Sequence, residues 1–498
     1  MIILLKMNIE SLNGRYRMDK FNPTIIIPGI GQSKVDMIDS KGNKIKSAWP
    51  FDIDMKSALD DLKGSIMKMM LFRKDAGFSD KVANIVRSIT FPLSCKSDGS
   101  SLNPLRTVTY EKSVKECTDG EKRFIYKMVP MEGLGEKIGE ENLFFFAYNP
   151  FGDVYPTAEK LNGFIESVKE KTQSEKVNII AVSLGAAVLK GYLDMYADKK
   201  DISSIVCVCS ALDGTKCAGD IFTDSLDLGD PAKFLSYAGD KASQIAPMVN
   251  MIPKDVVDVT LTKSIDTAKN DLLYNCTMMW ACVPVSDFQE ASDKHLKNAD
   301  PVLKEKVTRF YNYSLTFPDK IRELAKDGVR FCIVSGYGKQ FLPIFKSKNE
   351  DSDSVINVSS SSLGAQSSDG KIDVSACVLP DNTWFFKNQG HSAAAYNDVV
   401  LSLAEKFITG EIENVHSSEN YPQFNTARNI KKLKYNIVPK AEKTINDETV
   451  SPEIKDKLKA LNEKYSVLLK TTVTENAQSV TELENEYKEV FDSMENKE

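Results

Sequence analysis

Apolar and polar positions along this chain follow two periods, one typical of buried strands and the other of amphipathic helices. Short apolar runs bounded by turn-forming residues predict strands, because β-branched and aromatic side chains fill them. These runs are Thr24–Ile27, Leu143–Ala147, Val177–Val182, Ile202–Ser210 and Val329–Ser335. Helical spacing predicts helices near 55–72, 161–168 and 319–326. Strands and helices that alternate in this way predict an α/β fold with a mainly parallel sheet and helices on both faces.

The pattern is interrupted in places, which predicts an elaborated core. Residues 40–140 mix helical and irregular segments and are expected to be an insertion, and residues 211–317 have little strand signal but many helix formers. The core pattern then returns with a polar loop at 349–371, a short apolar segment at Asp373–Leu379, and a last helix that begins at His391 and ends before Gly410. We therefore predict a core at 19–210 and 318–410 and a mostly helical cap at 211–317.

The remaining residues, 411–498, are rich in Lys and Glu and predict a helical C-terminal extension. Pro452 follows Ser451 at the start of one amphipathic helix, and Ser479-Val-Thr-Glu482 is a capping box for another. Together they predict a helical hairpin. It is expected to dock on the core, brace the cap or bind a partner.

Composition and charge narrow the function classes. A net charge of -6, with Lys and Arg scattered among Asp and Glu, offers no basic stripe for a phosphate backbone, so nucleic acid is not an expected partner. Nine cysteines without a regular framework are typical of free thiols in a reducing compartment. The four apolar residues Ile2–Leu5, between Met1 and Lys6, are too few for a signal peptide, and no apolar run is long enough to span a bilayer. We expect a cytoplasmic protein whose membrane contact, if present, is peripheral and made through the cap.

Ser183 is the candidate nucleophile. Ala181-Val-Ser183-Leu-Gly185 lies between a predicted strand and a helix of small residues, as in the nucleophile elbow of α/β-hydrolases. A serine at the tip of such a turn has strained backbone angles, and small residues two positions away on either side let the strand and helix approach. The sequence therefore predicts an α/β-hydrolase fold. The alternative for Ser183 is a serine that caps an ordinary strand-to-helix turn.

His391 and an aspartate complete the predicted triad. In α/β-hydrolases the chain order is Ser, then Asp or Glu, then His, and only His391 lies in a loop before the final helix. Its alternative role is to cap that helix. Asp369 is the predicted acid, because Gly370 lets the loop turn and a strand-like segment follows; Asp373 is the second choice, and either aspartate could instead be a solvated loop residue.

The loop Pro28-Gly-Ile-Gly-Gln-Ser33 follows the first strand, where this fold places backbone amides that stabilise an oxyanion. We predict Ile30 and Leu184 as the donors. The loop lacks the Gly-Lys-Ser/Thr ending of a phosphate loop and the third glycine of a dinucleotide fingerprint. No Cys or His spacing predicts a metal site, so no cofactor is expected.

Several segments between residues 20 and 410 occur in the order seen in one enzyme family. They are Ile25-Ile-Ile-Pro-Gly-Ile-Gly-Gln-Ser33, Trp49-Pro50, Ala211-Leu-Asp-Gly-Thr-Lys216, Trp280–Pro284, Phe331–Gly338 and Ser368–Ala376. The chain thereby resembles the lecithin:cholesterol acyltransferase-like branch of the α/β-hydrolase lipases. Two motifs depart from that family: its Gly-His-Ser-Leu-Gly elbow is Ala-Val-Ser-Leu-Gly here, and its Tyr-Asp-Trp-Arg is Tyr148-Asn-Pro-Phe151.

The resemblance implies a serine hydrolase or acyltransferase that acts on lipid acyl esters, with the acid at Asp369. It also implies that the cap, whose apolar patch Met278–Val283 could contact lipid or be buried, controls access to the site. Two alternatives stay open. The chain could be a carboxylesterase or thioesterase for soluble esters, or a non-catalytic binding protein that keeps the fold.

Overall fold

A computed structural model describes residues 21–51, 55–227, 252–368, 370–427, 430, 432–470 and 477–495. Its centre is a seven-stranded sheet in the order β12-β11-β8-β7-β6-β1-β5, in which every neighbouring pair is parallel. The strands are β1 (Thr24–Ile27), β5 (Leu143–Phe145), β6 (Val177–Val182), β7 (Ile202–Val208), β8 (Arg330–Tyr337), β11 (Thr383–Lys387) and β12 (Phe424–Thr426). The predicted α/β fold with a mainly parallel sheet is confirmed.

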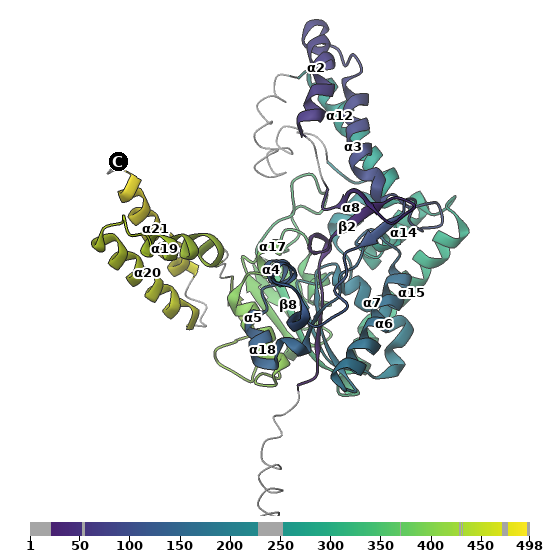
Figure 1. The fold of residues 1–498 in the computed structure, drawn as a ribbon. Coiled ribbons are helices and arrows are strands. Elements are labelled where there is room, and N and C mark those ends of the chain that lie inside the picture. The colour runs from purple at the N-terminus through teal and green to yellow at the C-terminus, as the bar shows by residue number, and fades with distance from the viewer. Residues whose placement is uncertain are drawn as a thin grey trace, which may run out of the picture.

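Each strand contributes to two apolar layers, because successive side chains point to opposite faces. Ile25 and Ile27 belong to one core, while Ile26 belongs to the other. The first core packs against α6 (Val154–Thr172), α7 (Gly185–Tyr196) and α15 (Pro301–Lys326). The second packs against α5 (Glu132–Ile138) and α18 (Asp398–Ile408). Helices therefore cover both faces of the sheet (Figure 1).

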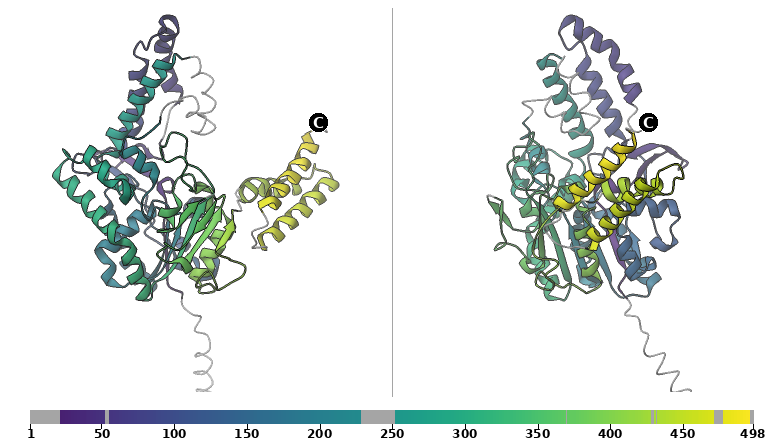
Figure 2. Two further views of the ribbon diagram at one scale, coloured as in Figure 1. Left: turned by 180° about the vertical axis from the view of Figure 1, so that it is seen from behind. Right: turned by 90° about the vertical axis from the view of Figure 1, so that its left-hand side faces the viewer.

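The insertion (40–140) and the cap (211–317) add structure to the core beyond the seven-stranded sheet. The insertion contributes β3 (Lys44–Trp49) and β4 (Leu105–Thr107), which form an antiparallel sheet with β2 (Val35–Ile38), a strand that precedes residue 40. It also contributes α2 (Met55–Phe72) and α3 (Phe78–Thr90), which pack with α12 (Lys254–Ala268) into an arm. The arm projects from the side of the core at which the sheet strands end (Figures 1 and 2). The arm is thus built from helices of both the insertion (40–140) and the cap (211–317), which pack against each other.

The rest of the cap comprises α8 (Lys216–Phe222), α13 (Thr277–Trp280), α14 (Val285–His295) and the first part of α15. The patch Met278–Val283 is not available to lipid, because its side chains are at most 9% exposed and belong to the first core. The helix expected at 319–326 is the end of α15, which continues through Pro318. Among the described residues, no helix is long and apolar enough to cross a membrane.

Two predicted elements near the C-terminal end of the core are corrected. Asp373–Leu379 is not the last core strand, since only Lys371–Asp373 is extended there, as β10, and it pairs with β9 (Gln366–Ser368) in a separate hairpin. The strand that precedes His391 is β11, which is fully buried except for Lys387. The final helix is divided into α17 (His391–Ala394) and α18.

The C-terminal extension has a small core of its own. It contains the predicted hairpin of α20 (Pro452–Lys470) and α21 (Ala477–Glu495), and the preceding helix α19 (Val438–Ile445) packs against α20. Leu458, Leu461, Tyr465 and Leu468 of α20 are buried in that core. The extension lies to one side of the sheet in Figure 2. Strand β12, which joins the main sheet, also falls after residue 410.

Candidate active site

Ser183 lies in a sharp turn between β6 and α7. Its φ is +52°, a left-handed conformation that a residue with a side chain adopts only when its surroundings impose it. The Ser183 amide donates to the Val208 carbonyl at 3.2 Å, and the Ser183 carbonyl accepts from the Ala211 amide at 3.1 Å. Both bonds tie the turn to the end of the neighbouring strand β7. The backbone of the sheet therefore fixes the direction in which the serine hydroxyl points.

Close approach of α7 to β1 explains the small residues of this turn. A Cβ atom at Gly185 would lie 2.4 Å from the Ile27 carbonyl oxygen, so only glycine fits there. Gly29 is similarly close, since its Cβ would lie 3.1 Å from Ser183 Cβ. Ala181, which replaces the usual first glycine of the elbow, is completely buried in the first core.

His391 reaches Ser183 from the start of α17. Its Nε2 lies 2.8 Å from Ser183 Oγ, and its ring is 15% exposed. The backbone amide of His391 donates to the carbonyl of Asp353 at 2.7 Å, which holds the start of α17 against the loop that follows β8. The structure thus brings together the serine and the histidine that the sequence predicted.

The carboxylate that contacts His391 belongs to Asp353, whose Oδ2 lies 2.7 Å from Nδ1 of the histidine ring. The side chain of Asp353 is 0% exposed, and its other oxygen accepts from the amides of Val355 and Ile356 at 2.9 and 2.7 Å. Because an ionised carboxylate can only accept, Nδ1 carries the proton and Nε2 is left to accept from the Ser183 hydroxyl.

The contact with His391 that was predicted for Asp369 is therefore made by Asp353. Asp369 itself lies outside the described residues. The second choice, Asp373, is an exposed residue whose carboxylate accepts from the Ser375 amide at 2.8 Å. That hydrogen bond lowers the pKa of Asp373. The carboxylate bonded to His391 Nδ1 is that of Asp353, not that of Asp373.

Sequence reasoning missed Asp353 because nothing local distinguishes it in the polar loop. Its position depends on contacts distant in sequence: Ser352 pairs with Lys339 across the loop, and a Cβ at Gly336 of β8 would lie 2.9 Å from Asp353 Cβ. One signal was present. Asp353 is followed by Ser354 and then by Val355 and Ile356, and an aspartate in a polar loop often accepts from the backbone amide two residues further on.

Burial dominates the electrostatics around Asp353. Cys209 lies beside it at the end of β7, and burial, together with the Asp353 charge, raises the pKa of the Cys209 thiol well above its ordinary value. Cys209 is therefore a neutral neighbour that adds no second negative charge beside Asp353. Gln389, which is 1% exposed, accepts from Asn397 Nδ2 at 2.7 Å and so links the histidine loop to the cap of α18.

The loop after β1 lies against the serine. Ile30 begins a short 3-10 helix, and Leu184 follows the nucleophile, so both amides belong to helix starts whose N–H groups have no partner within the helix. Among the described residues, neither amide has a hydrogen-bond acceptor. The amide of Gly29 is already occupied by Gln32 Oε1 at 2.6 Å. This leaves the two predicted donors, Ile30 and Leu184, free to bind an oxyanion.

Three side chains brace this loop. Trp49 Nε1 donates to the Ile30 carbonyl at 2.7 Å, Gln32 Nε2 donates to the Met128 carbonyl at 2.6 Å, and the Tyr148 hydroxyl donates to the Pro28 carbonyl at 2.8 Å. Burial raises the pKa of Tyr148 well above its ordinary value, so the tyrosine stays a donor. Trp49 of the Trp49-Pro50 motif thus holds the peptide group between Ile30 and Gly31 in place.

The other two histidines lie away from the serine. His295 in the cap stacks on Tyr274 with ring centroids 3.9 Å apart and approaches Asp224, and burial lowers its pKa. His416 is exposed and lies 3.3 Å from Asp381. Neither has a hydrogen bond to Ser183.

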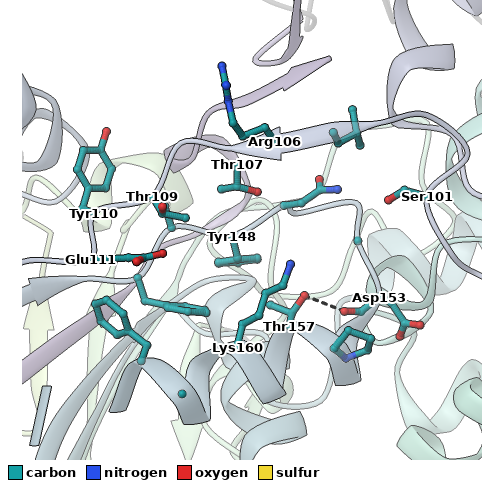
Figure 3. A pocket seen from close by; sticks show the side chains of 18 of the residues that line it. Ser101, Arg106, Thr107, Thr109, Tyr110, Glu111, Tyr148, Asp153, Thr157 and Lys160 are labelled. Carbon is teal, nitrogen blue, oxygen red and sulfur yellow. Dashed lines mark hydrogen bonds between the residues drawn. The ribbon is translucent and has the colours of Figure 1, made fainter. Parts of the chain in front are cut away.

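A cavity of about 870 Å³ lies beside the edge strand β5, bounded by β4 and α6 (Figure 3). Arg106, Tyr148, Asp153 and Lys160 are among its lining residues, whereas Ser183 and His391 are not. Tyr148 separates this cavity from the oxyanion loop, since its hydroxyl is bonded to Pro28. The cavity is therefore not the space in front of the serine.

Comparisons with known proteins give structural likeness only. No protein-family model and no curated protein matches the chain. Among solved structures, the chain is similar to the mature lipase BlEst2 of Bacillus licheniformis, with 9% identity over 60% of this chain and 89% of that one, at a TM-score of 0.30. It is also similar to the lin2722 product of Listeria innocua, with 10% identity, coverage of 82% and 98%, and a TM-score of 0.28. A third is olei00960, a hydrolase from Oleispira antarctica, with 12% identity, coverage of 56% and 86%, and a TM-score of 0.24.

Proposed function

We propose that this chain cleaves acyl esters through an acyl-enzyme on Ser183. The observation that carries the proposal is the continuous pair of hydrogen bonds from Ser183 Oγ to His391 Nε2, at 2.8 Å, and from His391 Nδ1 to Asp353, at 2.7 Å. A serine hydroxyl becomes a useful nucleophile only when a base takes its proton, and a histidine oriented by a buried carboxylate is suited to that task.

The reaction follows from the positions of these groups. Ser183 Oγ attacks the ester carbonyl while His391 takes its proton, and the amides of Ile30 and Leu184 stabilise the charge that develops on the carbonyl oxygen. His391 then gives the proton to the departing alcohol, which leaves the acyl group on Ser183. Water, or an acceptor alcohol in the case of acyl transfer, is activated by His391 and releases the acyl group. Asp353 remains ionised and holds the imidazolium in place.

The substrate class that we propose is a lipid ester. The support is the order of sequence motifs, in particular the Trp49 motif and the Pro28-Gly loop, which contact each other through the bond from Trp49 Nε1 to Ile30. Soluble esters and thioesters are the alternative. An enzyme for lipid esters should hydrolyse long-chain esters in micelles faster than the same concentration of monomeric short-chain esters.

The experiment is a comparison of wild type with Ser183→Ala on p-nitrophenyl esters of increasing chain length, with and without acceptor alcohols. We expect Ser183→Ala to lower kcat by roughly 10³-fold or more, because removing the nucleophile leaves only binding and oxyanion stabilisation. Ser210→Ala is a matched control, since Ser210 is a buried serine beside the elbow whose hydroxyl donates to the Ala181 carbonyl at 2.8 Å. A folded wild type that cleaves no ester, or a Ser183→Ala variant with full activity, would overturn the proposal.

A further inference from the structure

The end of helix α2 carries the large apolar side chains with the highest exposure in the described part of the chain. Leu71 is 71% exposed, Phe72 66% and Met67 63%, and no other large hydrophobic residue among those described is as exposed. All three lie within the last six residues of α2, at the tip of the arm. Single exposed apolar residues are ordinary, but such a cluster marks a surface that binds something.

The exposure does not result from a helix that has failed to pack. Met69 of the same turn is 1% exposed and packs with Phe78 of α3 and Val256 of α12. Residues four apart lie on one face of a helix, so Met67 and Leu71 form a ridge, and this ridge faces away from Met69. Helix α2 therefore has one apolar face inside the arm and a second one in solvent.

Cations lie near the end of α2, directly after it and at the start of α12. Lys68, Arg73, Lys74 and Lys254 are exposed, and none of them has an ion pair among the described residues. Of the nearby acids, Asp75 is used within the arm, where it accepts from the Ser79 amide at 2.7 Å and the Ser79 hydroxyl at 2.6 Å, and Asp255 is exposed. The tip thus combines protruding apolar side chains with an excess of positive charge.

The arm points in a direction that suits the proposed reaction. It rises above the edge of the sheet where β1, β6 and β8 end (Figures 1 and 2), and that is the edge from which Ser183 and the oxyanion loop extend. A planar surface that contacts the tip would face the same edge.

We propose that the tip defined by Met67, Lys68, Leu71, Phe72, Arg73 and Lys74 binds the surface of an anionic phospholipid bilayer. The three apolar side chains enter the boundary between headgroups and acyl chains, and the cations pair with lipid phosphates. The binding itself is independent of catalysis. The role of this binding in catalysis, which is to hold Ser183 near an ester in a membrane, rests on the proposed function.

The test is sedimentation of the full-length protein with sucrose-loaded vesicles, either of phosphatidylcholine alone or with 30 mol % phosphatidylglycerol. We expect binding to the anionic vesicles that weakens with salt, and weaker binding to the neutral ones. The double variant Leu71→Ser/Phe72→Ser should lower the partition coefficient at least tenfold, because most of the inserted apolar surface is removed. Lys68→Gln/Arg73→Gln should lower it on anionic vesicles only, by about fivefold for each cation.

The matched control is Ile45→Ser/Val467→Ser, which removes two side chains that are 57% and 61% exposed elsewhere on the chain. It should bind like wild type. The proposal is overturned if wild type does not bind vesicles, if the control and the tip variants bind equally, or if the tip variants instead abolish a dimer seen by sedimentation velocity. The last result would mean that a second copy of the chain covers the tip.

Failure of this proposal and failure of the proposed function give different results. Ser183→Ala should bind anionic vesicles normally if the tip is a membrane site, whatever the catalytic outcome. Conversely, Leu71→Ser/Phe72→Ser should hydrolyse a soluble short-chain ester at the wild-type rate and lose activity only on esters presented in vesicles.

Discussion

The two sides of the candidate site are built by different means. On the serine side, Ser183 is held by backbone bonds to β7 and by the close approach of Gly185 to β1, all at the ends of adjacent strands. On the histidine side, Asp353 and His391 lie on separate loops that follow β8 and β11, and side-chain contacts bring them together. The serine side is formed by one strand, one turn and one helix that are consecutive in sequence. The histidine side depends on how the long segment between β8 and β11 packs against the sheet.

The comparison teaches where each side is vulnerable. Apart from Ser183 itself, a change among the packing residues on the serine side should act mainly on stability, because it disturbs the packing of a helix against the sheet. A change on the histidine side should act mainly on rate, because it disturbs hydrogen bonds that matter only to the proton transfer.

The largest effect is expected from Asp353→Asn. An asparagine can donate to Nδ1 and thereby favours the wrong tautomer of His391, so kcat should fall by roughly 10³- to 10⁴-fold. The exposed Asp373 provides a matched control, and Asp373→Asn should keep activity within about twofold. Steady-state hydrolysis of a p-nitrophenyl ester measures both. Equal losses in the two variants would contradict the assignment of the acid.

Gly185→Ala should be the most damaging change on the serine side. The new Cβ would lie 2.4 Å from the Ile27 carbonyl oxygen, so α7 or β1 must move, at a cost of about 3 kcal/mol in the free energy of unfolding. Gly31→Ala is the control, because nothing lies within 4 Å of its Cβ position. Urea unfolding compares the two. A Gly185→Ala protein as stable as wild type would show that packing does not fix the elbow.

Lys190 should produce a pH effect on the serine side. It is a buried residue of α7 whose Nζ donates to the Leu212 carbonyl at 3.0 Å and lies over the Phe310 and Phe317 rings; burial lowers its pKa to about 8. The folded state therefore binds the Lys190 proton more weakly than the unfolded chain does. The buried charge lowers the free energy of unfolding by its full amount below pH 8, and this cost disappears as the pH rises from 8 towards 10.5.

Wild-type stability should accordingly rise over that interval relative to Lys190→Met, which has no such proton. At pH 7 the methionine variant should be more stable by about 1 to 2 kcal/mol, since removing the buried charge outweighs the lost hydrogen bond to Leu212. Urea unfolding at pH 7 and pH 9.5 measures the difference. A gap that stays constant between these pH values would show that Lys190 is not the titrating group.

Trp49→Phe should have the smallest effect. It removes the hydrogen bond to the Ile30 carbonyl but keeps an aromatic ring beside Phe51 and Phe151. If the Ile30 amide stabilises the oxyanion, kcat should fall about five- to tenfold with little change in KM, because the interaction is stronger in the transition state. A change in KM alone would place Trp49 in substrate binding instead.

The same contrast explains what could be predicted from the sequence. Strands β1 and β6 and helix α2 have the predicted bounds, because each is a self-contained run of apolar positions with turn formers at its ends. Ser183 and His391 were also within reach, since chain order and the adjacent elements point to them. Ser183 Oγ and His391 Nε2 lie 2.8 Å apart, which agrees with that interpretation.

The acid could not be chosen in the same way. Asp353 and Asp369 lie in one Ser- and Asp-rich loop, and the choice between them depends on the pairing of Ser352 with Lys339 and on the space left by Gly336. Strand β11 was missed for a related reason: Thr383–Lys387 is short, and the polar loop before it hid where the sheet resumes. The arm joins residues 55–90 to residues 254–268, a contact that no local pattern contains.

The most direct test of the account is the rate at which a fluorophosphonate modifies the purified protein, compared for wild type, Asp353→Asn and Asp369→Asn, with the modified residue identified by peptide mass spectrometry. The account predicts modification of Ser183, a rate reduced at least 100-fold in Asp353→Asn, and a wild-type rate in Asp369→Asn. A folded wild type that is not modified at Ser183, or a rate that depends on Asp369 and not on Asp353, would contradict it.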